Sequence, residues 1–197
     1  MVTMDQVKEL RDITGVSVMQ CKKALEEAEG DKEKAIEILK RKSKDIAGKK
    51  GDRTLGSGTV QSYIHLGGSV GSMVELSSET DFVSKNEEFK KLAYDIAMHV
   101  AAANPEFVRR EDISEEVIED LKKVFTEEAL AAGKNDPVVK EKVVLGKLNT
   151  YFAERALLEQ PFVKNGDVTV GALVDEAVQK FGERIEIARF ARFSTVR

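Results

Sequence analysis

The glycine pair Gly67-Gly68 is the sequence feature that most limits how this chain can fold. Apolar and polar residues alternate over 59–66, and a second strand-like stretch follows over 70–76. Two such runs on either side of a glycine turn predict a β-hairpin. The chain must therefore contain an antiparallel sheet, and the remaining segments have to pack around it.

The tail of the chain predicts a third strand. Its apolar residues are Ile185, Ile187, Phe190 and Phe193. Their spacing requires a change of facing near Ala188, as a β-bulge produces. Helical apolar stripes lie over 89–100 and 170–181. Because helices and strands do not alternate as βαβ units, we predict an α+β fold with a three-stranded antiparallel sheet packed with helices.

Residues 114–159 predict a pair of helices. Gly133 ends the first, and Asp136-Pro137 supplies a cap and a first-turn proline for the second, which should run to Gln160-Pro161. The connection is short, so the helices should pack antiparallel. We expect a helical-hairpin arm inserted in the core at about 113–159.

Three short helical periods occupy the N-terminal 40 residues, and each follows a capping residue, namely Thr3, Ser17 or Asp31. A bundle of this size buries little and is marginal alone. Lysine and arginine become frequent from Lys40 onward. The predicted organisation is a helical module over 1–41, a basic linker over 42–55 and an α+β core over 56–197.

The composition excludes several functional classes. The net charge of −4 gives no global basic field for nucleic acid. No signal-like N-terminus and no run of membrane-spanning length is present, and the single Cys21 fits a reducing cytoplasm. The two histidines lie in different predicted elements, and no nucleophile or phosphate-loop motif occurs. We therefore predict no cofactor, no metal site, no membrane partner and no enzymatic activity.

One connection carries an unusual residue pair. Between the second strand and the helix over 89–100 stands Thr80-Asp81-Phe82-Val83. Binding residues often lie on such loops, and a phenyl ring there requires burial somewhere. Phe82 either packs in its own core, which is the commoner case, or enters the core of a partner. His65, near the hairpin turn, is open to the same two interpretations, a partner contact or plain solvent exposure.

Two long motifs resemble the bacterial translation elongation factor Ts family. Residues 10–25 are similar to its N-terminal signature, and residues 75–85 to its second signature. The hairpin over 58–71, residues 160–163 and the closing residues 189–193 also fit, so the resemblance covers nearly the whole chain. Ser77 and Ser78 stand where many members carry Asn and Cys. The single core repeat resembles the short form of the family.

The resemblance implies a guanine nucleotide exchange factor for the GTPase elongation factor Tu. The family inserts a pair matching Asp81 and Phe82, flanked by Thr80 and Val83, near the magnesium site of that GTPase. Its N-terminal module is a UBA-like three-helix bundle. The docking positions of this module correspond here to Arg11, Val18, Met19 and Lys22. In the core, His65 is a weaker candidate for contact with the same GTPase. Short members act as homodimers, so a homodimer is expected by analogy.

Two other classes remain as alternatives. The basic linker and the arginine-rich tail favour an RNA-binding or ribosome-associated protein, whose binding would weaken steeply with salt. The helical bundle alone would suit a ubiquitin-binding or scaffold protein. The first alternative conflicts with the net negative charge, and the second leaves residues 80–83 without a role.

Overall fold

A computed structural model describes residues 2–195 of the chain. The residues group into two compact units. The first unit contains residues 1–61, 74–94 and 172–188, and the second contains 62–73, 95–171 and 189–197. The predicted boundaries at 41 and 55 divide the chain into consecutive segments, whereas each of these units includes separate stretches of the sequence. The two boundaries therefore stay a prediction.

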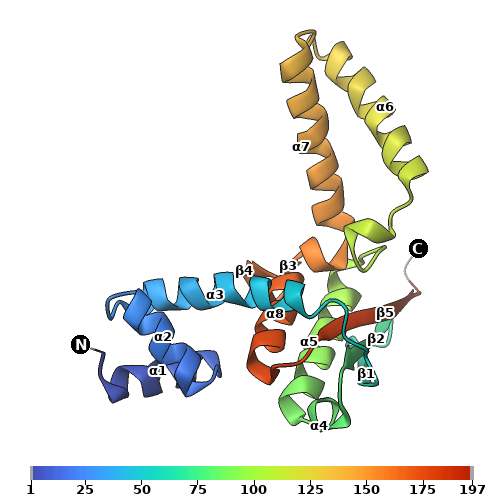
Figure 1. Ribbon diagram of the computed structural model, residues 1–197. Helices are drawn as coiled ribbons and strands as arrows, with labels where there is room; N and C mark the ends of the chain where they lie inside the picture. Colours follow the sequence, from blue (N-terminus) through green and yellow to red (C-terminus); the bar gives the residue numbers. More distant parts are fainter. Residues whose placement is uncertain (1, 196–197) are drawn as a thin grey trace. The chain divides into compact units, whose positions relative to one another are not determined.

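Three helices open the first unit: α1 (Met4–Thr14), α2 (Val18–Glu27) and α3 (Lys32–Lys49) (Figure 1). Thr3 and Gln6 form the capping box expected for α1, and Ser17 and Asp31 cap the other two helices. A small apolar core joins them, and its largest buried side chains are Val7, Leu10, Leu25 and Leu39. Helix α3 continues to Lys49, so the first half of the expected linker is helical.

Strands β1 (Ser57–Ile64), β2 (Val70–Ser78) and β5 (Ile185–Ser194) form a three-stranded sheet in the order β1-β2-β5. Gly67 and Gly68 have φ of 88° and 70°, the left-handed region that glycine adopts without strain. The hairpin and the third strand are therefore confirmed. Along β5, Ile185 and Ile187 are buried, and after them the least exposed positions are the even-numbered Phe190 and Arg192, which are half-buried. This shift agrees with the predicted change of facing for Phe190, whereas Phe193 is exposed.

Helices α5 (Glu87–Ala103) and α8 (Val170–Phe181) pack with the sheet. The stripe predicted for α5 is buried from Phe89 to Val100 except at Leu92, which is half-buried. Phe89 meets Phe181 edge to face at 6.0 Å between ring centroids. In the second unit the Ser72 hydroxyl donates to the carbonyl of Ala97 at 2.6 Å, which ties β2 to α5. The α+β class, with helices on a three-stranded antiparallel sheet, is thus confirmed.

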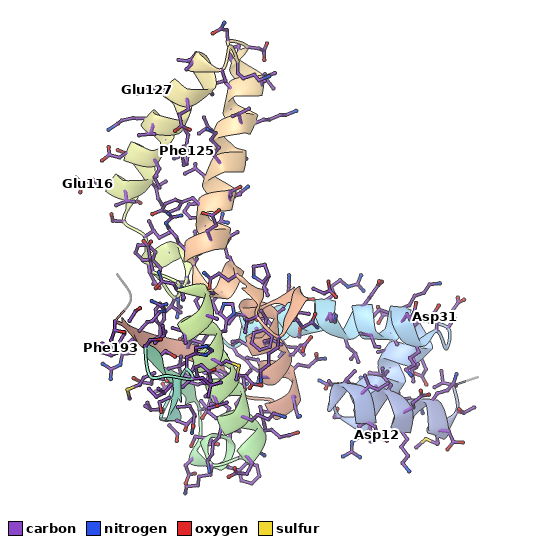
Figure 2. The ribbon with its side chains drawn as sticks, turned by 180° about the vertical axis from the view of Figure 1, so that it is seen from behind. Asp12, Asp31, Glu116, Phe125, Glu127 and Phe193 are labelled. Carbon is purple, nitrogen blue, oxygen red and sulfur yellow. The ribbon has the colours of Figure 1, made fainter. Side chains whose placement is uncertain are left out.

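The arm consists of η1 (Arg110–Asp112), α6 (Glu115–Ala131) and α7 (Pro137–Arg155). Ile113, Leu148 and Phe152 form its buried centre. Figure 2 shows Phe125 between the two helices, with Glu116 and Glu127 on the outer side of α6. Beyond the arm follow η2 (Leu157–Glu159) and a two-stranded ribbon of β3 (Pro161–Phe162) and β4 (Asn165–Thr169).

Two local predictions were wrong. Residues 81–84 form a one-turn helix, α4 (Asp81–Ser84), rather than a loop. Helix α7 stops at Arg155 rather than at Gln160. The backbone N–H groups of Leu157 and Leu158 donate to the carbonyls of Phe107 and Val108 at 2.9 and 3.0 Å, so these residues pair with another segment instead of continuing the helix.

Candidate functional site

The candidate site is centred on α4, which follows the end of β2 directly. Its four residues are divided between two environments. The side chain of Phe82 is 83% exposed, whereas that of Val83 is only 2% exposed. A single helical turn places neighbouring side chains about 100° apart, so Val83 faces the core when Phe82 faces solvent. Phe82 is the most exposed phenylalanine in the first unit, and its ring does not pack in the core of this chain.

Asp81 lies beside Phe82 and is also exposed. Its carboxylate accepts a hydrogen bond from Lys85 Nζ at 2.6 Å, one helical turn further on. That hydrogen bond is the main reason why the pKa of Asp81 lies below its usual value, and the charge of Lys85 adds to the effect. Asp81 is therefore a carboxylate at neutral pH, held by a surface pair that a stronger partner can displace.

Ser84 and Glu87 have the spacing of a capping box, but Ser84 does not cap the following helix. Its side chain is buried, and its hydroxyl lies 2.8 Å from that of Ser57 on β1. Asn86 takes the capping role, because its side-chain oxygen accepts from the N–H of Glu88 at 2.8 Å. Ser84 thus anchors α4 to the sheet and leaves the first turn of α5 to Asn86.

Thr80 precedes α4, and the hydrogen bonds of its N–H and its hydroxyl lie outside the helix. Its side chain makes no cap bond to α4. Instead, its N–H and its hydroxyl donate to the two carboxylate oxygens of Glu183, at 3.0 and 2.6 Å. Glu183 lies 103 residues further along the chain, and no local pattern indicated the contact.

The N-terminal candidates lie on α1 and α2. Met19 lies off the apolar stripe of α2, and it is 69% exposed. The spacing of Val18 and Ile13 places them on the apolar faces of their helices, yet they are 41% and 56% exposed. Lys22 follows one turn after Met19 on α2, and Arg11 is exposed on α1. The bundle therefore presents apolar side chains flanked by cationic ones.

His65 belongs to the second unit and lies in the hairpin connection. It is exposed, and its Nδ1 lies 3.0 Å from the hydroxyl of Tyr63. The other histidine, His99, is buried with Nε2 2.9 Å from Gln160 Oε1, and its Nδ1 accepts from the N–H of Val163 at 3.1 Å. His99 therefore joins structural elements, as its place on a helical stripe indicated.

No cluster of three metal-ligating side chains occurs among residues 2–195, nor does any helix there have the length and apolarity to cross a membrane. The candidate site accordingly consists of an exposed ring, a carboxylate and their supports.

Comparison with known proteins gives one consistent result. A family described as "Elongation factor TS" matches residues 22–196. Elongation factor Ts of Carboxydothermus hydrogenoformans is 54% identical over 193 residues, which cover 98% of this chain and 88% of that protein. Elongation factor Ts of Desulfotalea psychrophila is 51% identical over 192 residues, covering 98% and 97%. That of Alkaliphilus oremlandii is 49% identical over 192 residues, covering 98% and 88%.

Proposed function

The chain belongs to the elongation factor Ts family, and from this premise we propose that it is the guanine nucleotide exchange factor of elongation factor Tu in translation elongation. The RNA-binding and ubiquitin-binding alternatives have no comparable support. The observation that carries the finer mechanism is Phe82, a large ring held in solvent on a helical turn whose other side is buried.

Exchange requires a difference in affinity between two states of the partner. GTPases hold GDP largely through phosphate contacts and Mg²⁺. An exchange factor must therefore bind the nucleotide-free state better than the GDP state. Burial of the Phe82 ring in a site that opens only in the nucleotide-free state would contribute roughly 1.5–3 kcal/mol to that difference. GDP must weaken binding of the exchange factor by the same factor, because the coupling is reciprocal.

Asp81 supplies the second part of the proposed mechanism. Carboxylates are preferred magnesium ligands, and Asp81 is a carboxylate at neutral pH, with a pKa that Lys85 lowers further. Placed next to a magnesium site, this carboxylate would compete with the existing ligands for the ion. The proposed insertion of Asp81 and Phe82 therefore weakens the phosphate and metal contacts of GDP together.

The bundle would dock the chain on the GTPase before insertion. Met19 and Val18 offer exposed apolar area, and Lys22 and Arg11 add positive charge next to it. Apolar anchors ringed by charges are typical of protein interfaces. No enzymatic step is required of this chain, since exchange only releases a bound nucleotide.

The direct test is release of fluorescent GDP from elongation factor Tu in a stopped-flow instrument. Addition of the chain should raise the release rate in a saturable manner, and excess unlabelled GDP should prevent rebinding of the label. An unchanged rate at saturating chain would refute the proposal. A separate titration of labelled RNA with the chain tests the RNA-binding alternative, which predicts a salt-sensitive complex.

We also propose a homodimer through the open face of the sheet in the second unit. The Ser72 hydroxyl donates to the carbonyl of Ala97, and Arg192 Nε donates to that of Ala101, both on α5. Ser72 and Arg192 therefore lie on the face of the sheet that α5 covers. Their neighbours Met73 and Phe193 must point the other way, and they are 48% and 70% exposed. Ile64, which is 66% exposed, reaches over Gly71, where an added Cβ would lie 2.6 Å from its Cδ1. A second copy would supply the same apolar patch in return.

A further inference from the structure

Two connections distant in sequence are tied together beneath α4. The first is Glu79-Thr80, between β2 and α4, and the second is 182–184, between α8 and β5. Gly182 ends α8 in the left-handed region, with φ of 73°, and this turn directs Glu183 away from the helix. Glu183 is half-buried and takes both donors of Thr80, one on each carboxylate oxygen.

These bonds use every polar group of Thr80. Its N–H and hydroxyl donate to Glu183, and its carbonyl accepts from the Ser78 hydroxyl at 3.0 Å and from the N–H of Ser84 at 3.3 Å. The hydroxyl is therefore not available to cap α4. Hydrogen bonds to a carboxylate are shorter and stronger than neutral ones. Glu183 thus fixes the residue from which α4 begins.

A helix of one turn has no stability of its own, so its orientation depends on its anchors. Helix α4 has three: buried Val83, the contact between Ser84 and Ser57, and the Thr80–Glu183 pair. The first two lie at the C-terminal half of the turn. The N-terminal half carries Asp81 and Phe82, and the Thr80–Glu183 pair is its only anchor among the three.

We propose that Glu183 is a positioning residue for nucleotide exchange, which holds Thr80 so that Asp81 and Phe82 are presented to the partner in one orientation. The inference rests on the proposed function and names a residue outside the segment 80–83. Pre-organisation of this kind lowers the cost of ordering the segment when the complex forms.

Further hydrogen bonds link the same two connections, 79–80 and 182–184. The carboxylate of Glu79 accepts from the N–H of Arg184 at 2.5 Å and from Arg53 Nη1 at 3.1 Å. The Arg184 N–H is the leading reason why the pKa of Glu79 is lowered, so this residue stays charged. A guanidinium N–H of Arg184 also bonds the carbonyl of Arg53. Arg53, at the end of the basic segment, therefore helps to tie the two connections together.

The test measures GDP release from elongation factor Tu as a function of chain concentration, with Glu183→Ala and Glu183→Gln. For Glu183→Ala we expect the maximal release rate to fall about tenfold or more, because a small misplacement of a reacting group can cost up to about a hundredfold. The half-saturating concentration should change less than about twofold, since the bundle still docks. Glu183→Gln, which can still bond Thr80, should recover part of the rate.

Two comparisons separate positioning from general stability. Glu88→Gln removes a carboxylate that pairs with Lys180 of α8 at 2.9 Å, and it should leave the release rate unchanged. In a Phe82→Ala background, Glu183→Ala should have little further effect, because both changes remove the same presented ring.

Each outcome decides between the two claims. A wild-type maximal rate for Glu183→Ala, with Phe82→Ala impaired, refutes the positioning role and leaves the proposed function intact. A rate loss for Glu183→Ala that persists undiminished in the Phe82→Ala background also refutes it. Absence of exchange by the wild-type chain refutes the proposed function instead.

Discussion

At the scale of single residues, the molecule separates groups that hold the fold from groups left for a partner. Phe82 and Phe89 lie seven positions apart, yet Phe89 is fully buried and Phe82 is 83% exposed. A ring in solvent adds little to the stability of its own fold, whereas truncation of a core phenylalanine typically costs ~3–5 kcal/mol. These two residues therefore form a matched pair for mutation.

Phe82→Ala should lower the rate of GDP release strongly and change the free energy of unfolding by less than ~1 kcal/mol. Phe89→Ala should act mainly on stability, and thermal unfolding should show a much lower melting temperature. Urea unfolding and the stopped-flow release assay measure both effects. A large loss of stability in Phe82→Ala would show that the ring packs in the core of this chain in solution.

Met19 allows an independent test of the proposed docking surface. Met19→Glu replaces an exposed side chain, so the chain should stay folded, while a charge at an apolar contact should weaken the complex with elongation factor Tu about tenfold or more. Met4→Glu is the matched control, because Met4 is 68% exposed on α1 and lies outside the proposed contact residues. Isothermal titration calorimetry gives both affinities. Equal affinities for the two variants would contradict docking through Met19.

Sequence reasoning identified the unusual residue pair but not its support. An aromatic residue beside a carboxylate on a connection is visible in the sequence, and so is a methionine off its helical stripe. Glu183 could not be found in this way, because its contact with Thr80 spans 103 residues. The contact forms only when the connections 79–80 and 182–184 lie next to each other in the folded chain. Val18 and Ile13 show the opposite limit, since a periodic pattern alone does not tell which apolar residue the small core leaves outside.

At the scale of elements, helices and strands with long apolar patterns were predicted well, while short or terminal segments were not. Helix α5 has its stripe buried except at Leu92, which is half-buried. Helix α4 was missed because four residues are too few to show a helical period. The predicted length of α7 was too great because Leu157 and Leu158 extend its apolar pattern. Their N–H groups pair with the carbonyls of 107 and 108 instead. Tertiary contacts thus decided the ends of elements.

His99 joins three elements of the second unit, and this arrangement makes stability depend on pH. Its Nδ1 accepts from the N–H of Val163, so the neutral ring carries its proton on Nε2 and donates to Gln160, whose amide in turn donates to the carbonyl of Glu154 at the end of α7. Burial lowers the pKa of His99, against a smaller opposing effect of the Gln160 bond. Protonation would abolish the bond from Val163.

The sign of the pH effect follows from this shift. The unfolded chain takes up a proton on His99 near its ordinary pKa of about 6.5, whereas the folded chain does so only at lower pH. The stabilising contribution is therefore present above about pH 6.5 and is lost as pH falls. His99→Gln should flatten the decline in unfolding free energy between pH 7.5 and 5.5, measured by urea titration.

His65→Gln is the control for this experiment, because His65 is the other histidine and is exposed. It should leave the pH dependence as in the wild type. Burial raises the pKa of Asp175 and of Glu176 on α8, and these groups favour the folded state as pH falls. Both chains contain Asp175 and Glu176, so the contribution of these two groups cancels when the pH dependence of His99→Gln is subtracted from that of the wild type. An unchanged slope in His99→Gln would contradict a role of His99 in the pH dependence.

At the scale of the whole molecule, the proposed function needs surfaces with separate purposes. The bundle offers Met19, α4 offers Phe82, and the sheet leaves Ile64, Met73 and Phe193 exposed. A single chain keeps such apolar side chains in water only at a cost, and contiguous apolar surface usually marks an interface. Under the proposals above, the first two groups would contact elongation factor Tu, and the third would contact a second copy of this chain.

The dimer gives a prediction that sedimentation equilibrium checks directly. At micromolar concentration the wild type should have twice the chain mass of 21.8 kDa. Phe193→Glu should shift it toward the monomer, because two-fold symmetry brings the patch of each copy against the other and buries the new charge twice. Phe82→Glu is the control, since it alters an equally exposed ring outside the sheet and should leave the dimer intact. A wild-type mass near 21.8 kDa would mean that the open sheet face serves another contact.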